Sequence, residues 1–138
     1  MESKLIFYPV IGQILLTLGM YIKLTIVKNQ ALSNAEVDLN RRALHGDAWP
    51  DSVLKVSNNL QNQFESPVLF YILCFVLWAL NAVDMLVLVI TSAYVLLRVV
   101  HGVVHTGSNT VAVRKKVFMV SVILLMALCA LCLKSLLI

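Results

Sequence analysis

The chain has 138 residues, of which 60% are hydrophobic and only 13% are charged. This balance lies far outside that of soluble globular proteins and places the chain among integral membrane proteins. The formal net charge is +4, but no basic cluster is interleaved with aromatic residues that would stack on bases. We therefore expect no nucleic-acid partner.

Four apolar stretches predict helices at about residues 5–27, 60–80, 85–105 and 116–137. Each is close to the roughly 20 residues that cross the ~30 Å hydrocarbon layer. The link at residues 81–84 is short, so the second and third helices must be antiparallel neighbours. We predict an all-α integral membrane protein in which residues 1–138 form one antiparallel bundle of four transmembrane helices, with a loop at about residues 28–56. The first stretch lacks a small-residue cleavage site, which favours a retained helix over a signal peptide.

The basic residues are distributed unevenly between the two ends of this bundle. Seven lie in the first and third connections or beside them, and two lie at the opposite end: Lys28, Arg41, Arg42, Lys55, Arg114, Lys115 and Lys116 against Lys4 and Lys134. By the positive-inside rule, both long connections face the cytoplasm and both termini face away from it. The small size and the lack of a targeting extension favour a bacterial inner membrane over the endoplasmic reticulum.

The second predicted helix begins with polar residues. Asn58, Asn62 and Glu65 are four and three residues apart, so a helix places them on one face. Ionisable side chains inside a membrane are costly and indicate a functional site. We therefore interpret this face as one half of a ligand site.

A second polar stripe lies near the end of the third predicted helix. Tyr94, Arg98, His101 and His105 follow one another at intervals of four, three and four residues. Antiparallel neighbours bring this stripe to the depth of Glu65, where Arg98 is expected to form an ion pair with that carboxylate. An ion pair that only fixes helix register is the alternative interpretation.

A basic run follows at the start of the fourth predicted helix, at residues 114–116. It adds positive charge to a cleft that is expected to be wet, net basic and suited to an anionic ligand. The alternative is that this run serves only as an orientation signal that contacts lipid headgroups. The three cysteines all fall in apolar stretches, so we expect buried thiols and no metal site.

Together these elements resemble a known family. Asn62-x-x-Glu65 followed closely by Pro67, and Arg98-x-x-His101 near the end of the third helix, are similar to the membrane-associated proteins in eicosanoid and glutathione metabolism, the MAPEG family. The resemblance covers essentially the whole chain. It implies a homotrimer that binds glutathione as a co-substrate between subunits, near the cytosolic face.

The resemblance also implies a role for each matching residue. Asn62 and Glu65 would hold the amino end of glutathione, while Arg98 and His101 would support the site. Arg114 would stabilise the glutathione thiolate, because a nearby cation lowers the thiol pKa and the thiolate is the nucleophile.

The chain departs from the family pattern at three positions. Asn58 stands where many members carry an arginine, His105 where some carry a tyrosine, and Phe118 where certain members carry another tyrosine. The missing arginine removes a bidentate carboxylate clamp, for which Lys55 is the only local substitute. Asn58 and His105 complete the predicted binding set.

The leading functional prediction is a membrane-bound glutathione-dependent transferase or peroxidase that acts on lipophilic small molecules from the surrounding lipids. A non-enzymatic lipid-binding or scaffold member of the same fold is the first alternative. The second is a small proton-coupled exporter that uses Glu65 as its carrier, although small multidrug transporters place this acid in their first helix.

Overall fold

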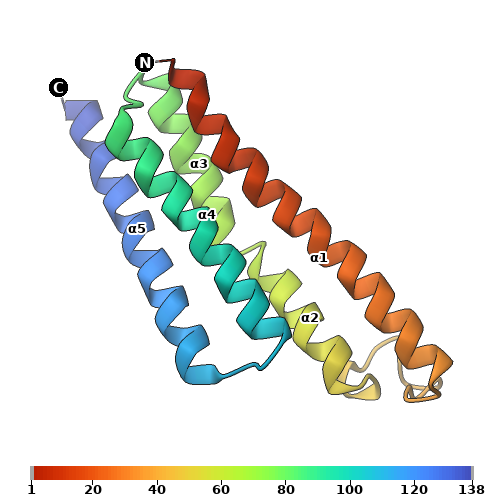
Figure 1. Cartoon of the computed structure of the whole chain (residues 1–138). Coiled ribbons are helices and arrows are strands. Elements are labelled where there is room, and N and C mark those ends of the chain that lie inside the picture. Colours follow the sequence, from red (N-terminus) through yellow and green to blue (C-terminus); the bar gives the residue numbers. More distant parts are fainter. Residues whose placement is uncertain (1, 138) are drawn as a thin grey trace.

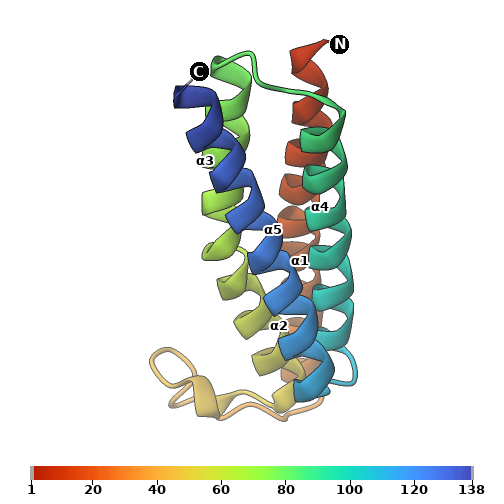
Figure 2. The same cartoon turned by 90° about the vertical axis from the view of Figure 1, so that its left-hand side faces the viewer.

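The structure, a computed structural model, describes residues 2–137, and all the regular secondary structure in that range is helical, with no strand. Its α-helices run in the order α1 (Phe7–Ser33), α2 (Asp51–Asn62), α3 (Ser66–Ala79), α4 (Met85–Thr106) and α5 (Val111–Leu137) (Figure 1). Two short 3₁₀ helices accompany them, η1 at Ser3–Ile6 and η2 at Gly46–Ala48. The two ends of the chain lie at the same end of the bundle (Figure 2).

Four segments are long and apolar enough to cross a membrane: Ser3–Ser33, Asp51–Ala79, Met85–Thr106 and Val111–Leu137. This confirms the predicted all-α chain with four membrane-spanning segments. The helices are longer than the apolar stretches, because polar residues continue them beyond the hydrocarbon layer. The first therefore runs to Ser33 rather than 27, and the last begins at Val111 rather than 116.

The second span is interrupted, whereas the sequence predicted one helix at about residues 60–80. α2 ends at Asn62 and α3 begins at Ser66, with Pro67 in its first turn. Proline has no N–H to donate, and its ring clashes with the carbonyl of the residue four positions earlier, here Gln63. The last turn of α2 tightens as a result, with the Gln63 and Phe64 N–H groups bonding to carbonyls three residues back.

The core between α3, α4 and α5 is apolar in the half of the bundle that holds the two termini. The Phe70 and Tyr94 rings stack there with their centroids 4.5 Å apart, and Leu77 and Leu128 are fully buried. The Tyr94 hydroxyl donates to Ser66 Oγ at 3.3 Å. Tyr94 thus marks the level at which the apolar half gives way to a polar half.

The first connection, residues 34–50, is shorter than the predicted loop at 28–56. Arg41 Nη2 lies 2.7 Å from Asp47 Oδ2, and this hydrogen bond raises the pKa of Arg41. Trp49 donates its indole N–H to the Arg42 carbonyl, while Lys28 Nζ lies 4.9 Å from the centre of the Trp49 ring. These contacts fold the loop back toward α1.

We predict that Phe70→Ala destabilises the bundle by about 2 kcal/mol, because it opens a cavity against Tyr94. The loss lies below that in soluble cores, since the hydrophobic effect does not drive helix association in lipid. Thermal unfolding in mild detergent measures it. Phe75→Ala on the same helix is the control, because Phe75 is 57% exposed. Equal losses in the two variants would contradict the packing described.

Candidate functional site

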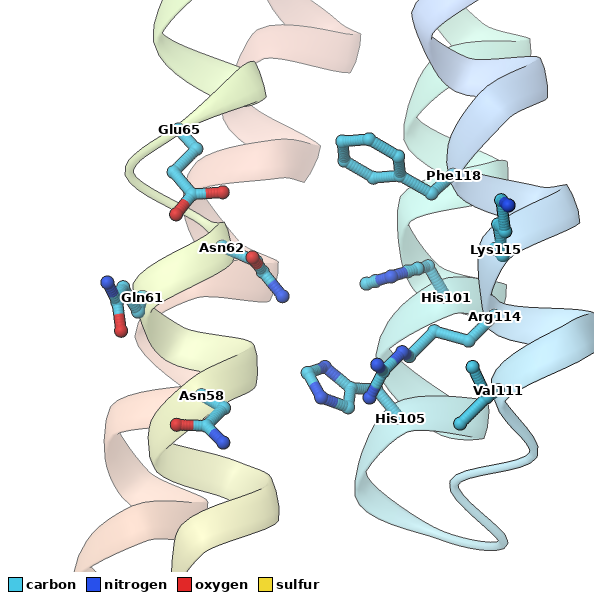
Figure 3. A pocket seen from close by; sticks show the side chains of 10 residues that line it. All are labelled: Asn58, Gln61, Asn62, Glu65, His101, His105, Val111, Arg114, Lys115 and Phe118. Atoms are coloured by element: carbon cyan, nitrogen blue, oxygen red, sulfur yellow. The ribbon is translucent and has the colours of Figure 1, made fainter. Parts of the chain in front are cut away.

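A pocket of about 500 Å³ opens in the polar half of the bundle, between α2 on one side and α4 and α5 on the other (Figure 3). Its volume is that of a small-molecule site. Ten residues line it: Asn58, Gln61, Asn62, Glu65, His101, His105, Val111, Arg114, Lys115 and Phe118.

The α2 side of the pocket carries amides and one carboxylate. Asn58 and Asn62 are one turn apart on α2, and Glu65 follows at the N-cap position of α3. The helix ends before Glu65, yet the interruption still directs this residue to the same pocket as the two asparagines (Figure 3). The predicted common face is therefore kept, although by a different backbone path.

The α4 side carries two histidines one turn apart. His101 and His105 are each 3% exposed, and their ring centroids lie 5.5 Å apart. The Phe118 ring of α5 packs 5.9 Å from the His101 ring. The His101 Nδ1 atom is buried and has no hydrogen-bond partner among residues 2–137.

The first turns of α5 bring positive charge to the pocket. Arg114 and Lys115 line it, against the single carboxylate of Glu65, so the lining is net basic. Arg114 Nη1 donates to Asn109 Oδ1 at 2.7 Å, and Asn109 has a left-handed φ of 52° that asparagine tolerates better than most residues. The pocket also lies at the N-terminal end of α5, where the helix dipole favours an anion.

Arg98 does not line the pocket, and it does not form the expected ion pair with Glu65. Its side chain is fully buried and Nη2 donates to the Asn62 carbonyl at 3.1 Å. Nε and Nη1 have no hydrogen-bond partner within the described chain. The interruption frees the Asn62 carbonyl, and this acceptor attracts Arg98 to the end of α2 in place of the Glu65 carboxylate.

Sequence reasoning missed two buried amides beside the site. Asn59 of α2 and Gln63, which directly follows α2, are both buried within the bundle, and Gln63 accepts a hydrogen bond from Gln13 of α1. The signal was present, because Asn59 and Gln63 are themselves four residues apart. It was overlooked since the neighbouring Asn58 and Asn62 form an equally regular stripe.

The structure thus brings together six of the seven predicted site residues: Asn58, Asn62, Glu65, His101, His105 and Arg114. Arg98 lies outside the pocket and contacts the site through its hydrogen bond to the Asn62 carbonyl. Lys55, the suggested substitute for the missing arginine, is absent from the lining. It is located one turn before Asn58 and half-buried.

These features define a class: a multi-pass helical membrane protein whose bundle opens at one end into a polar, net-basic pocket of small-molecule size. A sequence model of the MAPEG family matches residues 6–134, nearly the entire chain, so the protein belongs to the MAPEG family. Neither the curated proteins nor the solved structures that we searched include one that matches it.

We predict that the pocket is open to water, so adjacent positions of α2 differ sharply in reactivity. In a Cys129→Ala background, a membrane-impermeant maleimide is expected to label Asn58→Cys at least about tenfold faster than Asn59→Cys. Asn58 is exposed and lines the pocket, whereas Asn59 is fully buried. Labelling rates followed by mass spectrometry test this, and similar rates at the two positions would contradict it.

Proposed function

We propose that the protein is a membrane-bound glutathione-dependent transferase or peroxidase that acts on lipophilic electrophiles. The observation that carries the proposal is a pair of adjoining cavities. The polar pocket shares Glu65 and Phe118 with an apolar groove of about 550 Å³ between α3 and α5. One cavity suits a charged tripeptide and the other a molecule that arrives from lipid.

The apolar groove is lined mainly by aliphatic side chains. Leu69 and Ile72 of α3 face Val122 and Met126 of α5, and Cys129 lies farther along the groove. Cys129 is exposed, which corrects the expectation that all three thiols are buried. A lipophilic acceptor in this groove would place its reactive atom near Phe118, at the boundary with the polar pocket.

In the proposed complex, Glu65 pairs with the α-amino group of glutathione and Asn62 donates or accepts a hydrogen bond beside it. Arg114 lies on the opposite wall, where a cation lowers the thiol pKa and stabilises the thiolate. His101 hydrogen-bonds from α4, and Arg98 keeps the end of α2 in place. The thiol proton leaves to solvent through the open pocket.

The reaction then follows from the thiolate as nucleophile. In conjugation, the sulfur attacks the electrophilic carbon, an S–C bond forms and the leaving group departs with its electron pair. In peroxidase chemistry, the sulfur attacks the terminal oxygen of a hydroperoxide, the O–O bond breaks and the departing alkoxide takes up a proton from solvent. An alcohol and a glutathione sulfenic acid result, and a second glutathione converts the latter to the disulfide and water.

The assembly and orientation belong to the same proposal. We infer a homotrimer, supported by exposed apolar residues along α1 such as Ile11, Leu15 and Ile22, which suit a second copy as well as lipid. The basic connections face the cytoplasm of a bacterial inner membrane, so the pocket opens to that side. Glutathione is abundant in such reducing compartments.

A non-enzymatic lipid-binding member of the family is the second candidate. Asn58 favours it, because the asparagine gives the pocket no guanidinium for a glutathione carboxylate. The apolar groove would then hold a lipid chain without turnover. Lipid that copurifies with the protein, together with no glutathione binding, would distinguish this function from catalysis.

We predict that glutathione titrated into the purified protein produces the ultraviolet absorbance of a bound thiolate. Arg114→Ala should reduce this signal about tenfold or more at neutral pH, because a neighbouring charge shifts a pKa by about 1–3 units. Lys116→Ala is the control, since Lys116 carries the same charge two residues away but is absent from the pocket lining. A flat titration of the wild type at millimolar glutathione would refute the proposal.

We also predict that Asn58→Arg tightens glutathione binding about three- to tenfold, because arginine restores a bidentate clamp at an exposed position of the pocket. Asn58→Lys should give a smaller gain, since lysine is a point charge without fork geometry. Isothermal titration calorimetry measures both. Turnover that appears only in Asn58→Arg would identify a lapsed enzyme.

A further inference from the structure

Three buried amides connect α1 to the pocket through a continuous chain of hydrogen bonds. Gln13 Nε2 donates to Gln63 Oε1 at 2.9 Å, and Gln63 Nε2 donates to Asn59 Oδ1 at 3.1 Å. Asn59 Nδ2 then lies 3.2 Å from His105 Nδ1. The exposed fractions of the four side chains are 0%, 1%, 0% and 3% along the chain. We call these three amides the amide relay.

The relay has a direction, because each inner amide uses its oxygen on one side and its nitrogen on the other. Asn59 Oδ1 accepts from Gln63, so the group that Asn59 presents to the His105 ring is an N–H donor. The ring nitrogen Nδ1 must then accept. A neutral imidazole that accepts at Nδ1 carries its proton on Nε2.

Of the four hydrogen-bonded side chains, the three amides and His105, only His105 also lines the pocket. Because Asn59 occupies Nδ1, Nε2–H is the donor that remains for a bound molecule. The charged groups that line the same pocket are Arg114, Lys115 and Glu65, with His101 beside the ring. The ring therefore adds a directed donor to a basic wall, opposite the carboxylate that would hold an ammonium group.

A merely structural role explains the relay less well. Buried amides stabilise a membrane protein only modestly, and apolar side chains of similar size would fill the same space at less risk of an unpaired group. Gln13 Oε1 is indeed buried with no hydrogen-bond partner among residues 2–137. The relay nevertheless ends, through Asn59, on one nitrogen of one ring that lines the pocket.

We propose that Gln13, Gln63 and Asn59 are positioning residues that hold His105 as the Nε2–H tautomer, so that its ring donates a hydrogen bond to an anionic group bound in the pocket. The tautomer follows from the amide relay alone, and the identity of the anion as a glutathione carboxylate or thiolate rests on the proposed function. If the relay ran in the opposite direction, the ring would turn a lone pair toward the anion and repel it.

The helix interruption is part of this device. Gln63 lies between α2 and α3, just where Pro67 prevents a regular helix, and its side chain bridges the amides of α1 and α2. A displacement of α1 relative to α2 would therefore break the relay at Gln63. The state of the His105 ring is in this way tied to the packing of the two helices.

The test uses the full-length protein with ¹⁵N-labelled histidine in lipid nanodiscs, without glutathione, at an alkaline pH where imidazole is neutral. The chain has three histidines, and His105→Asn identifies the signals of His105. We expect a pyridine-like Nδ1 and a pyrrole-like Nε2–H. A proton found on Nδ1 in the wild type would overturn the proposal, whatever the variants do.

Gln63→Met tests the positioning role, because methionine has similar size but can neither accept from Gln13 nor donate to Asn59. Asn59 is then free to rotate, so His105 should become a mixture of the two tautomers. Gln13→Met, which lies farther from the pocket, serves if Gln63→Met fails to fold. Gln30→Met is the matched control, since Gln30 is an exposed amide on α1. An unchanged single tautomer in the folded Gln63→Met variant would overturn the positioning role.

Glutathione titration completes the experiment and separates the two proposals. Gln63→Met should weaken binding about three- to tenfold, whereas Gln30→Met should not change it. Equal affinity in Gln63→Met and the wild type would overturn the donor role of His105. If the wild type bound no glutathione at millimolar concentration, the proposed function would fail, and so would glutathione as the relay's anion. The tautomer measurement would still decide whether the amide relay determines the tautomer of His105.

Discussion

The architecture depends on how one interrupted helix satisfies its backbone in a membrane. Hydrocarbon offers no water to free N–H and C=O groups, so a break in a spanning helix needs side-chain partners within the protein. Pro67 imposes the break, and Arg98 donates from α4 to the Asn62 carbonyl that the break leaves open. The interruption directs Glu65 into the pocket and Gln63 into the bundle. The steric constraint of Pro67 thus positions both the carboxylate that lines the pocket and the amide that is buried behind it.

The bundle is divided along its length into two halves with different physics. Near the termini, α3, α4 and α5 pack through stacked rings and aliphatic side chains. Beyond Tyr94, α4 holds a buried arginine and two buried histidines, and α1, α2 and the residue after α2 hold buried amides that are linked by hydrogen bonds. Side-chain packing makes the apolar half rigid, and hydrogen bonds orient the side chains of the polar half. The pocket occurs only in the second, where polar groups remain free to meet a ligand.

Hydropathy predicted the four spans, helical periodicity grouped five residues of the pocket, and the basic run with the family resemblance added Arg114. Asn58, Asn62 and Glu65 were grouped correctly even though the helix ends before the last of them, because the proline break preserves their common side. Arg98 was misplaced, since opposite charges at similar depth suggested an ion pair. A backbone carbonyl as competing acceptor becomes visible only once the break is known. The amide relay could not be predicted for a similar reason. Which amides face inward depends on the rotation of α2 about its axis, and the sequence contains two equally regular pairs, Asn58 with Asn62 and Asn59 with Gln63.

The groove between α3 and α5 also determines which concentration scale applies to a substrate. Its walls are aliphatic side chains, with Leu69 and Met126 themselves exposed to the surroundings of the bundle. A molecule that enters there comes from the hydrocarbon phase, so its mole fraction in lipid, rather than its aqueous concentration, determines how often the groove is filled. Added detergent or lipid would dilute such a molecule at constant total amount. Half-saturation would therefore follow the volume of the membrane phase.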